Sequence, residues 1–203
     1  ALAISLAQSP LLNLVSAEKV GEALRSQSLP TNVPITRDFA PKLCQRLGAT
    51  VYLTGSIAKD GSGYSLRLNA FECATSSEIA SVKSEADSKD EVVHSLGSAA
   101  TQLRHEFGED PASLKKFDLR LDRATSASLD ALKAFAEGRL LTRERGSIEA
   151  VPALKKATDL DPKFALAYSN LAVGYYNLNQ NALAADRIRI AFELADRQTL
   201  RDR

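Results

Sequence analysis

The feature that most constrains the fold of this chain is an internal repeat: within the stretch from Ser128 to Asp196, the pattern of small and apolar residues recurs every 34 residues. Shifting this stretch against itself pairs Ala134 with Tyr168, Gly138 with Ala172, Leu141 with Tyr175, Ala150 with Ala184, Leu154 with Ile188 and Ala157 with Ala191. A fixed period of this length in helix-forming sequence is typical of stacked helix–turn–helix units. The sequence therefore predicts an all-helical array over this half of the chain.

Small residues at the repeated positions predict close contact between antiparallel helices. They are Gly138, Ala150, Ala157, Ala172, Ala184 and Ala191. We expect Leu141, Leu154, Tyr175 and Ile188 to fill the space around those contacts, because they follow helical spacing. Pro162 should begin the second unit, since proline is accepted in a first helical turn but not inside a helix.

These residues resemble the tetratricopeptide repeat, whose pattern runs aromatic, Leu, small, aromatic, then Ala, bulky apolar, Ala and Pro. The second unit supplies Tyr168, Leu171, Ala172, Tyr175, Ala184, Ile188 and Ala191. The first unit departs from the pattern, because Ala134 replaces the aromatic residue and Glu137 stands at the position of Leu171. The resemblance implies two repeats, 128–161 and 162–195, followed by the start of a third segment that runs to residue 203. We expect the chain to be a fragment of a longer protein.

In this family the first helix of each repeat lines a concave groove. The resemblance places in the groove Leu132, Phe135, Arg139, Thr142 and Arg143 of the first unit, and Leu166, Ser169, Val173, Tyr176 and Asn177 of the second. We expect a protein or peptide ligand there, with Arg139 and Arg143 suited to a carboxylate. Two alternatives stay open: the arginines are ordinary solvated helix charges, or the aromatic stripe is core for a further unit.

The first half of the chain mixes helical and strand patterns. We predict helices over Ala1–Gln8 and Ala17–Arg25, the second capped by Ser16, and a helix from Thr36 to Leu47 that ends at Gly48. Pro41 within that last helix should bend its first turns. The short apolar run Leu11–Ser16 predicts a buried strand.

A strand-rich stretch follows. Ala49–Lys59 and Tyr64–Cys73 flank the turn sequence Asp60-Gly61-Ser62-Gly63, which predicts a β-hairpin. Glu78–Glu85 should form a third strand, and a helix should run from Ser88 to Phe107. The expected fold class is α+β: an N-terminal α/β sandwich with a small, mostly antiparallel sheet, then the all-α array. Residues 109–127 should form a linker, extended near Phe117, that lies along one of the two domains.

The segment CQRLGATVYLTGSI, from Cys44 to Ile57, is similar to the LGxxYxLxGSI segment of the TolB-like amino-terminal domain. The resemblance covers about residues 1–108 and lacks the first strand of that family. Such domains, often followed by tetratricopeptide repeats, occur in bacterial multidomain proteins, some with a serine/threonine kinase or a DNA-binding domain upstream of a membrane span. The resemblance implies a sensory or scaffolding role outside the cytoplasmic membrane, and it supplies no active site.

Composition and motifs argue against several classes of function. Residues 1–110 hold 10 Lys/Arg and 13 Asp/Glu, residues 111–203 hold 16 and 12, and neither balance has the basic excess of a nucleic-acid-binding domain. No apolar run has the length of a membrane span. His94 and His105 stand too far apart on one predicted helix to share a metal ion, and no nucleophile elbow, Walker loop, kinase motif or zinc spacing occurs. We expect no enzyme activity and no cofactor in this chain.

Cys44 and Cys73 are the two cysteines, and the sequence leaves two states open. An even number of cysteines in an oxidising compartment permits a disulfide. Two buried thiols that behave as small apolar residues are the alternative.

Three functions follow as hypotheses. The first is a non-enzymatic protein-interaction or scaffolding module. The second is the extracytoplasmic sensor or regulatory region of a bacterial transmembrane serine/threonine kinase, with the kinase domain upstream. The third, a hydrolase within the first domain, would need a deep pocket where His94 or paired carboxylates converge.

Overall fold

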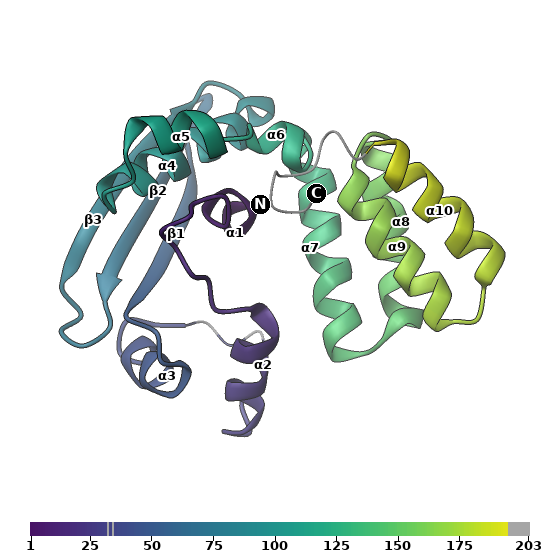
Figure 1. Cartoon of the computed structure of the whole chain (residues 1–203), viewed down its shortest axis with the longest axis horizontal. Helices are drawn as coiled ribbons and strands as arrows, with labels where there is room; N and C mark the ends of the chain where they lie inside the picture. Colours follow the sequence, from purple (N-terminus) through teal and green to yellow (C-terminus); the bar gives the residue numbers. More distant parts are fainter. Residues whose placement is uncertain (32, 34, 195–203) are drawn as a thin grey trace.

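The computed structural model describes residues 1–31, 33 and 35–194. It contains an N-terminal three-stranded antiparallel sheet with helices, followed by a region of paired helices (Figure 1). The expected fold class is therefore confirmed. Figure 1 shows the two halves as the two sides of an arch, joined at the top through helices α4 to α6.

The sheet consists of β1 (Val51–Asp60), β2 (Gly63–Glu72) and β3 (Glu78–Ala86) in the order β1-β2-β3. Asp60 pairs with Gly63 at the end of the first hairpin, and Gly61 in its turn has a φ of 58°. Glycine adopts this left-handed conformation without the steric cost that a side chain brings. The predicted hairpin and third strand are both confirmed.

Helix α4 covers the β2–β3 side of the sheet. It spans Val92–Glu106 and follows a short 3-10 turn, Lys89–Glu91. Alternate strand residues and one helix face form the core between these layers, with Leu6 of the first helix packed against them: Leu68, Ala70, Ala80, Val82, Ala99, Ala100 and Leu103. The period of two along the strands and of 3.6 along α4 brings these two apolar faces together.

Three short helices precede the sheet: α1 (Leu2–Leu6), α2 (Ala17–Arg25) and α3 (Ala40–Leu47). The Ser16 side chain caps α2 by accepting a hydrogen bond from the Lys19 N–H at 3.3 Å. Helix α3 begins at Ala40, so Pro41 lies in its first turn, where it removes no intrahelical hydrogen bond. Gly48 ends α3 in a left-handed conformation, as expected.

The expected strand Leu11–Ser16 is wrong. The segment has no regular secondary structure, and the side chains of Leu11, Leu14 and Val15 are exposed. An apolar run forms a buried strand only where a sheet offers it a neighbouring strand, and the sheet here ends at β1 and β3.

The expected extended conformation near Phe117 is also wrong. The connection folds into α5 (Pro111–Phe117) and α6 (Leu121–Ala124). The Asp110 carboxylate caps α5 by accepting hydrogen bonds from two backbone N–H groups, and Pro111 follows in the first turn. The Gln8 side chain donates to the Leu119 carbonyl at 3.0 Å and accepts from the Leu119 N–H at 2.6 Å, which joins the connection to the first domain.

The C-terminal half consists of two helical hairpins: α7 (Leu129–Glu144) with α8 (Ser147–Leu160), and α9 (Ala165–Asn177) with α10 (Asn181–Glu193). The predicted small contact residues are all buried: Gly138, Ala150, Ala157, Ala172, Ala184 and Ala191. A Cβ atom added to Gly138 would lie 2.7 Å from side-chain atoms of Leu154. The close helix contact predicted from the period is therefore confirmed, but Ile188 is exposed and does not fill the space expected of it.

One core cluster crosses the boundary between the two halves. It contains Val93 of α4 and Leu121 of α6 together with Phe135, Phe164 and other residues of α7 to α9. The helical hairpins are thus packed on the first domain through shared apolar side chains.

Candidate functional site

The predicted groove residues divide between the core and the surface. Leu132 and Phe135 are 8% and 6% exposed and belong to the core cluster, so their placement in the groove is wrong. The reason is Phe164, which precedes α9 and packs its ring on that of Phe135 with centroids 4.8 Å apart. This fully buried side chain occupies the space that a ligand would need above Phe135.

The remaining predicted residues lie on the surface or at its margin. Val173 is 52% exposed and Tyr176 is 67% exposed, three residues apart on α9. Arg139, Thr142 and Asn177 are exposed, while Arg143, Leu166 and Ser169 are half-buried. The Asn177 amide donates a hydrogen bond to the Ser147 hydroxyl at 3.1 Å, so its side chain ties the two hairpins together.

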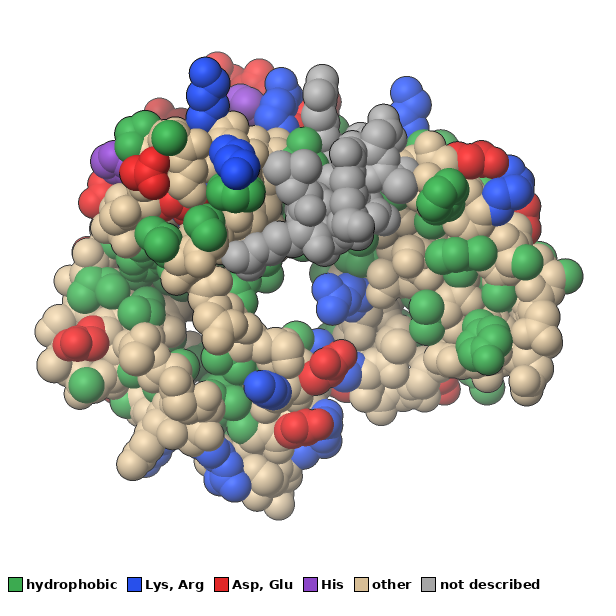
Figure 2. Space-filling model, in the orientation of Figure 1, with side chains coloured by type: hydrophobic (Ala, Val, Ile, Leu, Met, Phe, Trp, Pro, Cys, Tyr) green, Lys and Arg blue, Asp and Glu red, His purple; other side chains and the backbone are tan. Residues whose placement is uncertain are grey.

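Arginine side chains of this surface border a cavity between the two halves. The cavity has a volume of about 320 Å³ and is lined by Ser16, Ala17 and Glu18 from the start of α2, by Arg139, Thr142 and Arg143 of α7, and by Asn170 of α9. Figure 2 shows an opening between the halves of the molecule in this region, with basic and acidic side chains on its rim. The sequence predicted the α7 side of this site, but nothing in it indicated that α2 forms the opposite wall.

The charges that line this cavity are not neutralised by ion pairs. Among the residues that the structure describes, Glu18, Arg139 and Arg143 take part in no salt bridge within 4.0 Å. The Arg143 Nε atom is buried and has no hydrogen-bond partner. The Arg139 guanidinium lies 5.9 Å from the centre of the Phe135 ring, a cation–π contact that helps to hold it in place. A buried donor without a partner is rare in folded proteins.

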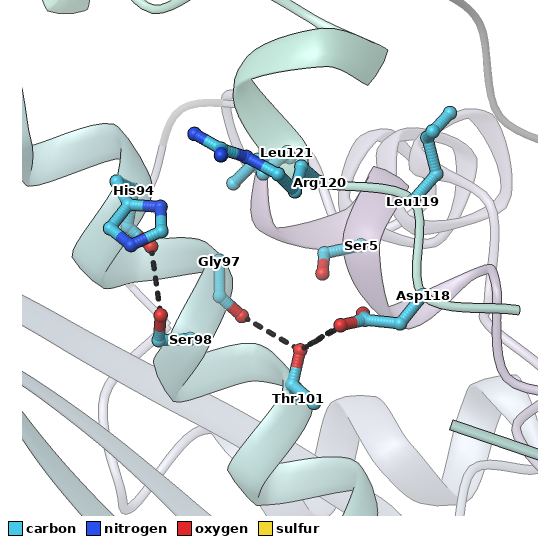
Figure 3. A pocket seen from close by; sticks show the side chains of 9 residues that line it. All are labelled: Ser5, His94, Gly97, Ser98, Thr101, Asp118, Leu119, Arg120 and Leu121. Atoms are coloured by element: carbon cyan, nitrogen blue, oxygen red, sulfur yellow. Dashed lines mark hydrogen bonds between the residues drawn. The ribbon is translucent and has the colours of Figure 1, made fainter. Parts of the chain in front are cut away.

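A second, smaller cavity lies where α1, α4 and the segment after α5 meet (Figure 3). Its volume is about 110 Å³, and its lining includes His94, Thr101, Asp118 and Arg120. The Thr101 hydroxyl contacts both Asp118 carboxylate oxygens, at 2.9 and 3.0 Å, and Arg120 pairs with Asp122. The hydrolase hypothesis named a deep pocket with His94 or paired carboxylates: His94 does line this small cavity, whereas its single carboxylate, Asp118, is already engaged by Thr101.

A buried ionic network next to this cavity was not predicted. The Arg104 guanidinium, 0% exposed, donates two hydrogen bonds to the Glu109 carboxylate and a third to Asp118 at 3.1 Å. The Ser113 hydroxyl also donates to Glu109, at 2.8 Å. These hydrogen bonds, those from Arg104 above all, outweigh desolvation and lower the pKa of Glu109 to about 2. The network fastens the start of α5 to the end of α4.

Cys44 and Cys73 are joined by a disulfide, with their Cα atoms 6.0 Å apart. The bond links α3 to the residue that directly follows β2. His94 and His105 lie on α4 and share no ligand cluster, because no group of three or more potential metal-ligating side chains occurs in the described part of the chain. Of the helices in the described ranges, none has the length and hydropathy that a membrane span requires.

Further apolar side chains lie at the surface of α10, of which the sequence had singled out only Ile188, and that one for the core. Leu183, Ile188 and Phe192 of α10 are exposed, Phe192 at 81%. Figure 2 shows hydrophobic side chains on the surface of the half that holds α9 and α10. Neither family models, nor curated proteins, nor solved structures give a match to this chain.

Proposed function

We propose that this chain is a non-enzymatic protein-interaction module whose partner binds the exposed face of α9 and the adjoining face of α7. The observation that carries the proposal is the pair Val173 and Tyr176, two large apolar side chains on one helix face that are 52% and 67% exposed. Adjacent exposed apolar side chains rimmed by polar residues are typical of protein-binding surfaces. Tyrosine is also among the residues enriched at such interfaces.

The chemistry of this face defines the kind of partner. Val173 and Tyr176 offer apolar contacts, while Arg139 on the adjoining helix offers a guanidinium that no carboxylate of the described residues pairs with. A peptide or protein segment that carries apolar side chains and an acidic group would satisfy both. The 34-residue period and the resemblance to tetratricopeptide repeats support this proposal, because such repeats bind proteins or peptides through the first helix of each unit.

The test is partner capture with the full 203-residue chain. The double variant Val173→Asp with Tyr176→Asp should lose proteins that the unchanged chain retains, because each carboxylate would have to be desolvated within an apolar contact. Ile148→Asp is the matched control, since Ile148 is 71% exposed but lies on α8. Retention of the same partners by the double variant, or equal loss with the control, would refute this binding face.

A second role, as the extracytoplasmic sensor region of a bacterial transmembrane serine/threonine kinase, is favoured by one observation. The Cys44–Cys73 disulfide is the kind of bond that persists in oxidising compartments and is rare in the cytoplasm. The resemblance to TolB-like domains points in the same direction. The test is alkylation of free thiols after cells that produce the chain are quenched in acid and the protein is denatured, so that buried thiols also react. Cysteines that stay protected support a location outside the cytoplasm, and alkylated cysteines argue against it.

A further inference from the structure

The cavity between α2 and α7 has a composition different from that of the apolar face on α9. Its lining places an acidic group, Glu18, on α2 and two basic groups, Arg139 and Arg143, on α7. None of the three forms an ion pair with another described residue, so the opposite charges stand across the cavity without a direct contact. A ligand that carries both a positive and a negative group would meet a partner on each wall.

The polar groups around these charges also divide into donors and acceptors. The Asn170 side-chain nitrogen donates to the Leu166 carbonyl at 2.8 Å, which leaves its amide oxygen as an acceptor. The Thr142 hydroxyl donates to the Gly138 carbonyl at 2.9 Å, so its oxygen too can only accept a further hydrogen bond. The Ser16 oxygen accepts from the Lys19 N–H, and its own O–H remains a donor.

This inventory fits one class of small molecule. Glu18 on α2 offers an acceptor for an ammonium group, and Arg139 and Arg143 on α7 offer donors for a carboxylate. Asn170 and Thr142 add acceptors on the arginine wall, and Ser16 adds a donor on the α2 wall. A volume of about 320 Å³ lies at the lower end of the range usual for sites of small ligands.

We propose that the cavity lined by Glu18, Arg139 and Arg143 binds a small zwitterion of the α-amino acid class, with its carboxylate on the arginines and its ammonium on Glu18. The ligand would contact both halves of the molecule at once. The cavity shares Arg139 with the protein-binding face proposed above, but Val173 and Tyr176 do not line it, so variants of those two residues separate the two sites.

The first experiment is calorimetric titration of the full chain with the standard amino acids, one at a time. The amino acid that binds best is then compared with two of its derivatives: the N-acetyl derivative, which lacks the ammonium group, and the carboxamide, which lacks the carboxylate. We expect each derivative to bind roughly tenfold to a hundredfold more weakly than the free amino acid, because each leaves a charged group of the cavity without its partner. Equal binding of the N-acetyl derivative, or no binding of any amino acid at millimolar concentration, would overturn the proposal.

Two variants assign each charge to its wall. Glu18→Gln should weaken binding of the free amino acid but leave the already weak N-acetyl derivative unchanged, since that derivative has no ammonium group to lose. Arg143→Gln should weaken binding of the free amino acid but leave binding of the carboxamide unchanged, since the carboxamide has no carboxylate to lose its partner. Equal weakening of the amino acid and of its derivative would contradict the assignment.

Neighbouring residues outside the cavity supply the controls. Glu22→Gln on α2 and Arg145→Gln after α7 remove the same charges from exposed positions that do not line it. Both should bind the free amino acid as the unchanged chain does, and weakening by either would show a general effect of charge. The Val173→Asp, Tyr176→Asp double variant should keep amino acid binding, so failure of the protein-binding face and failure of the cavity can be told apart.

Discussion

The guanidinium of Arg104 and the carboxylate of Glu109 face each other in the interior and are joined by two hydrogen bonds, from Nε to Oε2 at 2.9 Å and from Nη2 to Oε1 at 2.7 Å. Both side chains are excluded from solvent, at 0% and 1% exposure. Breaking such a pair leaves a buried charge without compensation, which costs more than the pair itself contributes. This pair therefore governs how the connection between the two halves responds to mutation and to acid.

The contribution of this pair to the free energy of unfolding should depend on pH. The arginine contacts lower the folded-state pKa of Glu109 to about 2 from an ordinary value of 4.5. A lowered folded-state pKa stabilises the fold above the ordinary value, and this contribution is lost as the pH falls from about 5 towards 2. The difference in unfolding free energy between the unchanged chain and Glu109→Gln should be on the order of 3 kcal/mol at neutral pH and should shrink in acid. Denaturant titrations at several pH values would measure it, and two parallel curves would contradict the assignment.

The disulfide should stabilise the first domain. Cys44 and Cys73 close a loop with a sequence separation of 29, and restricting such a loop in the unfolded chain stabilises the fold by roughly 3–4 kcal/mol in the chain-entropy model. The double variant Cys44→Ser with Cys73→Ser, or reduction of the unchanged chain, should lower the thermal midpoint. A control follows from the chemistry: reductant should have no effect on the double serine variant. An equal midpoint for reduced and oxidised chain would show that the bond contributes nothing.

Gly138 should tolerate no large side chain. The Leu154 side chain lies 2.7 Å from the position of an added Cβ, and its backbone nitrogen lies 3.2 Å away. Gly138→Leu should destabilise the chain by about 1–3 kcal/mol or more, because α7 and α8 would have to separate. Ala136→Leu is the control, since Ala136 is exposed on the same helix. Thermal melting of the two variants decides the point, and an unaffected midpoint for Gly138→Leu would mean that the helix contact is wrong.

Phe164 should be a large contributor to the shared core. It is 0% exposed and packs against Phe135 between the hairpins, so Phe164→Ala should cost roughly 3–5 kcal/mol of unfolding free energy. Phe192→Ala removes the same side chain from a position that is 81% exposed, and should change stability by less than about 0.5 kcal/mol. Urea titrations would measure both. A similar loss for the two variants would show that burial of Phe164 is not the source of the effect.

Much of the fold could be predicted from the sequence because its signals are local. The turn around Gly61 fixed the hairpin, and the repeated small residues indicated the helix contacts that Gly138 and Ala172 now make. A signal for α5 is also present, since Asp110 before Pro111 is a capped helix start, but the alternation of apolar and charged residues around Phe117 points to an extended segment instead.

Other features depended on contacts between distant parts of the chain. Phe135 was placed in the groove because a family register says which helix face is concave, whereas only the packing of Phe164 shows that the position is filled. Predicting the cavity would require the position of Glu18 relative to Arg143, two residues separated by more than half the chain. No local pattern carries that information.

The core cluster that contains Val93, Leu121 and Phe135 has a mechanical consequence. Because side chains of α4, α6 and α7 share one close-packed cluster, a shift of α4 on the sheet would disturb the packing of α7 and, through it, of the hairpins.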